Sequence, residues 1–145
     1  MRRLALLALT VLVSACYGGS ASPTPGDMVD VLGELSAHGV TMTDTVAGDA
    51  GCADQTLVDN ARKLQVSFSP DGKTYTVYLF RWLNNADYLD AGSAFDNCAD
   101  AYLAAHPDSV VDKVDLSPWR AFGPDWTQDL HAAIRGALVD AAQGQ

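Results

Sequence analysis

Alternation between apolar and polar residues is strongest over residues 64–79, where it predicts a β-hairpin. Apolar side chains occupy every second position in both arms: Leu64, Val66 and Phe68, then Tyr75, Val77 and Leu79. Between the arms, Ser69-Pro70-Asp71-Gly72 has the composition of a tight turn. The other face of the second arm carries Thr76, Tyr78 and Phe80, so this strand could be covered on both faces.

Three stretches with helical spacing of apolar residues flank the hairpin. The first begins at Asp27 as a cap and ends before Gly39, with Met28, Val31, Leu32 and Leu35 on one side. The second runs from Asn84 or Asn85 to His106, before Pro107, and Gly92 loosens its middle. We expect the third to open at Asp125 with Gln128 as a capping-box partner. Its buried stripe is Leu130, Ile134, Leu138 and Ala141.

Two further strands are predicted on either side of the hairpin and its following helix, at residues 40–46 and 110–116. The order of elements is then helix, strand, hairpin, helix, strand, helix. The simplest fold that buries three amphipathic helices is a two-layer α+β sandwich. We therefore predict a four-stranded, mainly antiparallel sheet with about three helices packed on one face.

The start of the chain has the pattern of an exported protein. Arg2 and Arg3 precede an apolar run at residues 4–13, and small residues then lead into Cys16. A charged region, a short apolar region and a small-residue cleavage site form a secretory signal. The run is about half of the ~20 residues that a membrane-spanning helix needs.

Val13-Ser14-Ala15-Cys16 resembles the lipobox of bacterial lipoproteins. The resemblance covers residues 1–16 and implies removal of residues 1–15 and lipidation of Cys16. Acyl chains on this cysteine would hold the protein at a membrane. Its domain would lie on the extracytoplasmic side, at the bacterial cell membrane or envelope. The alternative is an ordinary secretory signal followed by a coincidental cysteine.

Residues 16–26 are rich in Gly, Ser and Pro and predict a lipidated N-terminus followed by a tether. A flexible chain of this length spans roughly 17 Å. The remaining residues, 27–145, have the length of one globular domain.

The chain is acidic, with a net charge of −9, and loss of Arg2 and Arg3 with the leader would make it more negative still. No basic stripe is present, so nucleic acid is not an expected partner. We interpret the charge mainly as a source of solubility. Membrane contact is expected through the acyl chains on Cys16, and the domain has an envelope protein as its expected partner.

Cys52 and Cys98 form an even pair once Cys16 is assigned to lipid, and an oxidising compartment favours a disulfide between them. The chain-entropy model gives such a bridge roughly 4 kcal/mol. The alternatives are a redox thiol pair or metal ligation with His38 or His106. Neither has the spacing of a known motif, so no metal site and no cofactor are expected.

The segment at residues 119–126 combines aromatic residues with one cation: Trp119, Arg120, Phe122 and Trp126. Aromatic residues with arginine are typical of binding hot spots. They are also typical of a core that closes where a strand leads into the last helix, with the arginine stem lying on a ring. Exposure of Trp119 or Phe122 would favour the binding interpretation.

No catalytic motif is present, so no catalytic residue is assigned. The hypothesis that follows is a non-catalytic, lipid-anchored envelope domain that binds or scaffolds another component. One alternative is an envelope inhibitor or small-ligand-binding module that uses residues 119–126. A second is a hydrolase whose triad is assembled in space from His38, His106 or His131.

Overall fold

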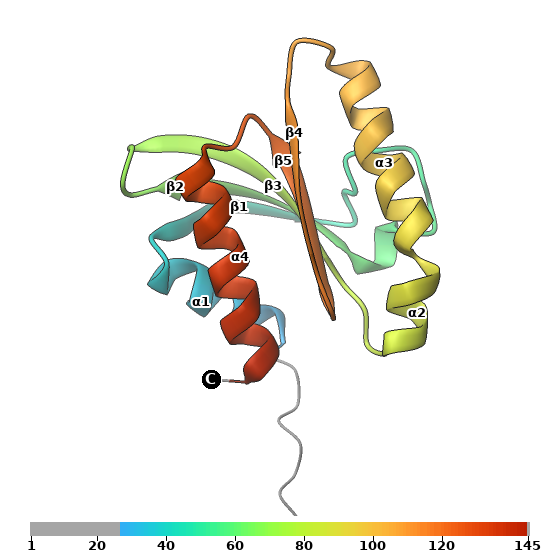
Figure 1. Ribbon diagram of the computed structural model, residues 1–145, viewed down its shortest axis with the longest axis horizontal. Coiled ribbons are helices and arrows are strands. Elements are labelled where there is room, and N and C mark those ends of the chain that lie inside the picture. Colours follow the sequence, from blue (N-terminus) through green and yellow to red (C-terminus); the bar gives the residue numbers. More distant parts are fainter. Residues whose placement is uncertain (1–26, 145) are drawn as a thin grey trace, which may run out of the picture.

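Five antiparallel strands form one sheet in the computed structural model, which describes residues 27–144 (Figure 1). Their spatial order is β1-β2-β3-β5-β4, and every neighbouring pair is antiparallel. The elements in chain order are α1 (Met28–Ala37), β1 (Val40–Ala47), the 3₁₀ turn η1 (Val58–Asn60), β2 (Ala61–Phe68), β3 (Lys73–Arg81), α2 (Asn85–Asp90), α3 (Gly92–Ala105), β4 (Val111–Leu116), β5 (Trp119–Pro124) and α4 (Gln128–Gln143).

The α+β class and the antiparallel sheet are confirmed, but the predicted number of strands was wrong. The fifth strand, β5, is the segment at residues 119–124, which was predicted as a connection between the fourth strand and the last helix. Pro118, Gly123 and Pro124 make this stretch look like a loop. It becomes a strand because it pairs with β3 on one side and β4 on the other.

The prediction that all helices pack on one face was also wrong, because α1 and α4 cover one face of the sheet while α2 and α3 cover the other (Figure 1). The physical reason lies in β3. Its odd-numbered residues Val77 and Leu79 pack with α1 and α4, and its even-numbered Tyr78 and Phe80 pack with α3. A central strand that is apolar on both faces requires two covering layers.

Local sequence signals set most helix ends. Asp27 caps α1 in a reciprocal capping box with Asp30, and Gly39 follows the helix with a φ of 78°. The helix expected over residues 84–106 is instead two helices, α2 and α3, which meet at Ala91 beside Gly92. None of the helices in residues 27–144 has the length and apolarity needed to cross a bilayer.

The last helix begins later than expected. Thr127, not Asp125, is the N-cap of α4, and its side chain accepts a hydrogen bond from the amide of Leu130. Asp125 has a φ of 55° and lies before the helix. Its carboxylate accepts from the amide of Val110 and thereby joins the end of β5 to the start of β4.

Candidate functional site

The four aromatic-segment residues lie in the interior of the protein. Trp119 and Phe122 are completely buried, Arg120 is 5% exposed and Trp126 is 7% exposed. Because β5 alternates between faces, Trp119 packs with α1 and α4 while Phe122 packs with α3. Burial supports the core interpretation of these four residues.

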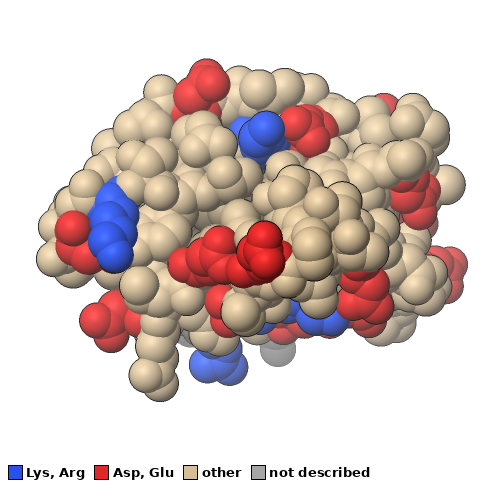
Figure 2. All heavy atoms as spheres, turned by 90° about the horizontal axis from the view of Figure 1, so that it is seen from above, with Lys and Arg blue, Asp and Glu red and all other residues tan. Residues whose placement is uncertain are grey.

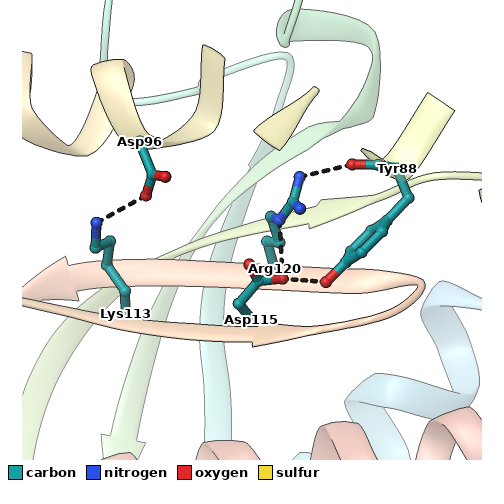
Figure 3. Close-up of polar contacts among 5 residues, drawn as sticks. All are labelled: Tyr88, Asp96, Lys113, Asp115 and Arg120. Carbon is teal, nitrogen blue, oxygen red and sulfur yellow. Dashed lines mark hydrogen bonds and ion pairs between the residues drawn. The ribbon is translucent and has the colours of Figure 1, made fainter. Parts of the chain in front are cut away.

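Arg120 is the buried cation at the centre of a polar network (Figure 3). Its Nε donates to Asp115 at 2.9 Å, and its Nη1 donates to the backbone carbonyl of Tyr88 at 2.8 Å. The Tyr88 hydroxyl donates to the same Asp115 carboxylate. Asp115 and Arg120 are directly opposed on β4 and β5, so the network joins this hairpin to α2.

Aromatic rings surround the Arg120 guanidinium on the α2 and α3 side. Its carbon lies 4.0 Å from the Tyr88 ring centroid, 5.3 Å from that of Trp82 and 5.6 Å from that of Phe95. Burial, followed by the hydrogen bond to Asp115, raises the pKa of the Tyr88 hydroxyl to about 12. The hydroxyl therefore stays protonated as a donor. Since the cation is 5% exposed and is held by Asp115, the Tyr88 carbonyl and three aromatic rings, we interpret the arrangement as structural.

The disulfide between Cys52 and Cys98 is confirmed, with a Cα–Cα distance of 5.4 Å and a sequence separation of 46 residues. Cys98 lies on the buried face of α3, and Cys52 lies in the loop between β1 and η1. The bridge therefore fastens that loop to α3 on one face of the sheet.

The three histidines make separate contacts. His38 Nε2 lies 2.8 Å from the Asp140 carboxylate of α4, and the ring of His106 contacts the Tyr102 carbonyl at the end of α3. His131 lies 3.2 Å from the Lys113 carbonyl. Within residues 27–144, no histidine contacts a serine in this way and no group of three His, Cys, Asp or Glu could hold a metal.

A hollow along α4 contains two of these histidines. It has a volume of about 630 Å³ and is lined by His38, His131, Arg135 and Asp140, among others. Most of its polar groups already have protein partners, because His38 pairs with Asp140 and His131 with a backbone carbonyl. It offers few free groups to a ligand.

A second cavity, of about 480 Å³, lies where α1 begins and β3 ends, and it contains two arginines. We call it the Arg62–Arg81 cavity. Its other lining residues come from the end of β1, from η1 and from the chain after β3: Met28, Ala47, Gly48, Val58, Asp59, Asn60, Ala61 and Leu83. A volume of this size is in the range of small-molecule sites, which is roughly 300–1,000 Å³.

Strand register brings the two arginines together. Arg62 pairs with Leu79, so Arg81 is its diagonal neighbour on the same face of the sheet. The rows that lead to them are otherwise apolar: Leu64, Val66 and Phe68 in β2, and Tyr75, Val77 and Leu79 in β3. Arginine thus replaces an apolar residue where each core-facing row ends. The signal is present in the sequence, because the alternation over residues 64–79 extends to both positions, but neither arginine was predicted as a site residue.

Neither arginine is neutralised by a carboxylate in the described part of the chain. The ion pairs there join His38 to Asp140, Lys63 to Asp49, Lys113 to Asp96 and Arg120 to Asp115. On the face that Figure 2 shows, acidic residues lie at several separate places. The cavity thus brings together two guanidinium groups that have no ion pair among residues 27–144.

One of the two arginines that line the cavity has an N–H group without a partner. Arg81 Nε is buried and makes no hydrogen bond within residues 27–144. The Arg81 guanidinium lies over the ring of Trp119, its cross-strand neighbour, at 5.4 Å from the ring centroid. The Trp119 Nε1 is the other buried donor without a partner there. Buried donors normally find acceptors, so these two N–H groups depart from the usual pattern.

Comparison with known proteins gives no relative: no family model, no curated protein and no solved structure matches the chain.

Proposed function

We propose that this protein is a lipid-anchored lipoprotein of the bacterial cell envelope whose domain binds a ligand or partner without catalysing a reaction. The anchor is assigned to Cys16, which lies outside the described residues. Residues 17–26 would tether the domain, which begins with the Asp27 cap of α1.

The Arg62–Arg81 cavity is the observation that carries the binding role. It provides a concave site with two unpaired cations and a buried N–H donor that lacks an acceptor. Concave sites with a few convergent polar groups are the usual form of ligand sites. The cavity replaces residues 119–126 as the candidate binding region, since the aromatic residues and the arginine of that segment are buried.

The disulfide supports an extracytoplasmic location. Disulfides persist in oxidising compartments and are rare in the bacterial cytoplasm. The bridge between Cys52 and Cys98 is consistent with export ahead of lipidation.

Metabolic labelling with a palmitate analogue, followed by membrane fractionation, tests the anchor. We expect the native protein to carry the label and to sediment with membranes. Cys16→Ala should lose the label and either leave the membrane fraction or accumulate unprocessed, whereas a Ser20→Ala control in the tether should behave as the native chain. Unchanged membrane attachment and labelling of Cys16→Ala would refute the anchor.

A further inference from the structure

The Arg62–Arg81 cavity lies at the end of the domain to which the tether leads. Met28, the first residue of α1, lines it, and α1 starts close to the end of the sheet at which β3 leaves for α2 (Figure 1). On the proposed function, on which this inference rests, residues 17–26 connect this end to the lipidated cysteine. With a span of roughly 17 Å, they would keep the cavity close to the lipid headgroups.

The charged groups of the cavity suit a singly charged oxyanion. Arg62 and Arg81 contribute two positive charges, and Asp59 contributes one negative charge. Guanidinium groups bind carboxylate and phosphate oxygens through paired N–H donors, and such charge-assisted hydrogen bonds are the strong ones. The unpartnered Arg81 Nε adds a donor that is already desolvated.

The remaining lining is suited to an apolar portion of the same ligand. Met28 and Val58 are half-buried, and Leu83 is 84% exposed. An exposed leucine beside two arginines matches the boundary between headgroups and acyl chains, where apolar side chains enter the lipid while cations meet phosphates. The volume of about 480 Å³ exceeds what a bare ion requires.

We propose that the Arg62–Arg81 cavity binds the phosphodiester group of an anionic membrane lipid, and so orients the tethered domain on the bilayer. The rest of the domain is acidic and is repelled by anionic lipids. The net negative charge therefore opposes non-specific attraction, and the two arginines of the cavity give the bound domain a preferred orientation. The same chemistry would accept a water-soluble phosphodiester, and the experiment separates the two sources.

Arginine labelling with phenylglyoxal tests the site without any substitution. The purified full chain, in non-ionic detergent, is labelled with and without sn-glycero-3-phosphoglycerol, the water-soluble headgroup of phosphatidylglycerol. We expect this diester to slow the labelling of Arg62 and Arg81 several-fold, and to leave Arg135 unchanged. Arg135 is an exposed arginine on α4, at the other hollow, and serves as an internal reference. Equal rates with and without the diester would overturn the proposal.

A matched pair of variants measures the contribution of the cavity. Arg62→Gln and Arg135→Gln remove the same charge, but only the first is in the cavity. For Arg62→Gln we expect the diester to bind about tenfold more weakly by calorimetry, equivalent to about 1.4 kcal/mol. Arg135→Gln should bind as the native chain does, and circular dichroism should show that both are folded. Equal weakening in both variants would mean that only net charge matters, which overturns the site.

The lipid as source is tested on vesicles. The chain is reconstituted into phosphatidylcholine vesicles with or without phosphatidylglycerol, and the same labelling is repeated. Protection of Arg62 and Arg81 only with phosphatidylglycerol supports the lipid headgroup. Protection by the soluble diester alone would overturn the proposal that the phosphodiester belongs to a membrane lipid, and it would assign the cavity to a soluble ligand.

Failure of the anchor is distinguishable from failure of the site. The soluble-diester measurement requires no acyl chain and can be made on protein from either cell fraction, while the palmitate label reports on Cys16 alone.

Discussion

Arg120 and Tyr88 contact each other twice. The guanidinium carbon of Arg120 lies 4.0 Å from the Tyr88 ring centroid, and its Nη1 donates to the Tyr88 carbonyl at 2.8 Å. Both contacts help to offset the cost of burying a charge, together with the ion pair to Asp115. The pair links α2 to the sheet, because the partners come from β5 and α2.

Replacement of Arg120 should therefore destabilise the fold. Arg120→Met keeps much of the side-chain volume but leaves the Tyr88 carbonyl without its donor. We expect a loss of about 2–4 kcal/mol in the free energy of unfolding, measured by urea denaturation, because one partner of a buried polar network is removed. Arg135→Met, on an exposed position of α4, should change it by less than about 0.5 kcal/mol. Similar values for both variants would contradict a structural role of the network.

Alkaline pH should destabilise the protein through two buried tyrosines. Burial is the largest cause that raises the pKa of Tyr78 and of Tyr88 to about 12, from an ordinary value of 10.0. The folded state then holds protons that the unfolded chain has released, so stability is complete below pH 10 and falls as the pH rises from 10 towards 12.

Absorbance at 295 nm follows tyrosinate formation and checks this expectation. In the folded protein, part of the tyrosine signal should appear well above the midpoint found in urea, and the melting temperature should fall over the same range. Tyr88→Phe should reduce the late component. A single transition at the ordinary tyrosine pKa in the folded protein would refute the shift.

Removal of the disulfide should also cost stability. For Cys52→Ala combined with Cys98→Ala we expect a loss of about 4 kcal/mol, because the unfolded chain is no longer constrained by the closed loop. The same loss should follow when the native protein is treated with a reductant before urea denaturation. Two reactive thiols from Cys52 and Cys98 in protein isolated without reductant would show that the bridge is absent in cells.

Two glycines should respond to alanine in opposite directions. A Cβ at Gly123 would lie 2.2 Å from the Thr76 carbonyl oxygen and 2.4 Å from Trp126 Nε1, which hydrogen-bond to each other. We expect Gly123→Ala to cost about 3 kcal/mol through overpacking and loss of that hydrogen bond. A Cβ at Gly33 would meet nothing within 4 Å, so Gly33→Ala in α1 should stabilise by about 0.5–1 kcal/mol. Thermal denaturation of the two variants checks the signs.

Local sequence signals were sufficient to predict several helices and strands. The turn at Pro70 and Gly72 and the alternation around it predicted β2 and β3, and the Asp27 cap predicted α1. These predictions succeeded because hydrogen bonds and packing within a few residues decide such features.

The hairpin alternation extends to Arg62 and Arg81, but the cavity around them was not predicted, because only the fold brings α1, the end of β1 and η1 to these two strands. The strand β5 was missed for a related reason: its conformation depends on β3 and β4 and not on its own composition. Residues with weak strand propensity are held in a strand when both neighbours offer backbone partners.

By itself, the sequence determined the α+β class, the hairpin, the first helix and the pairing of Cys52 with Cys98, because each follows from periodicity, local caps or the count of cysteines. Only the tertiary structure decided that helices cover both faces, that Arg120 is buried, and that Arg62 and Arg81 share a cavity. Each of these depends on strand order and register, which are set by long-range pairing and by the burial of both faces of β3.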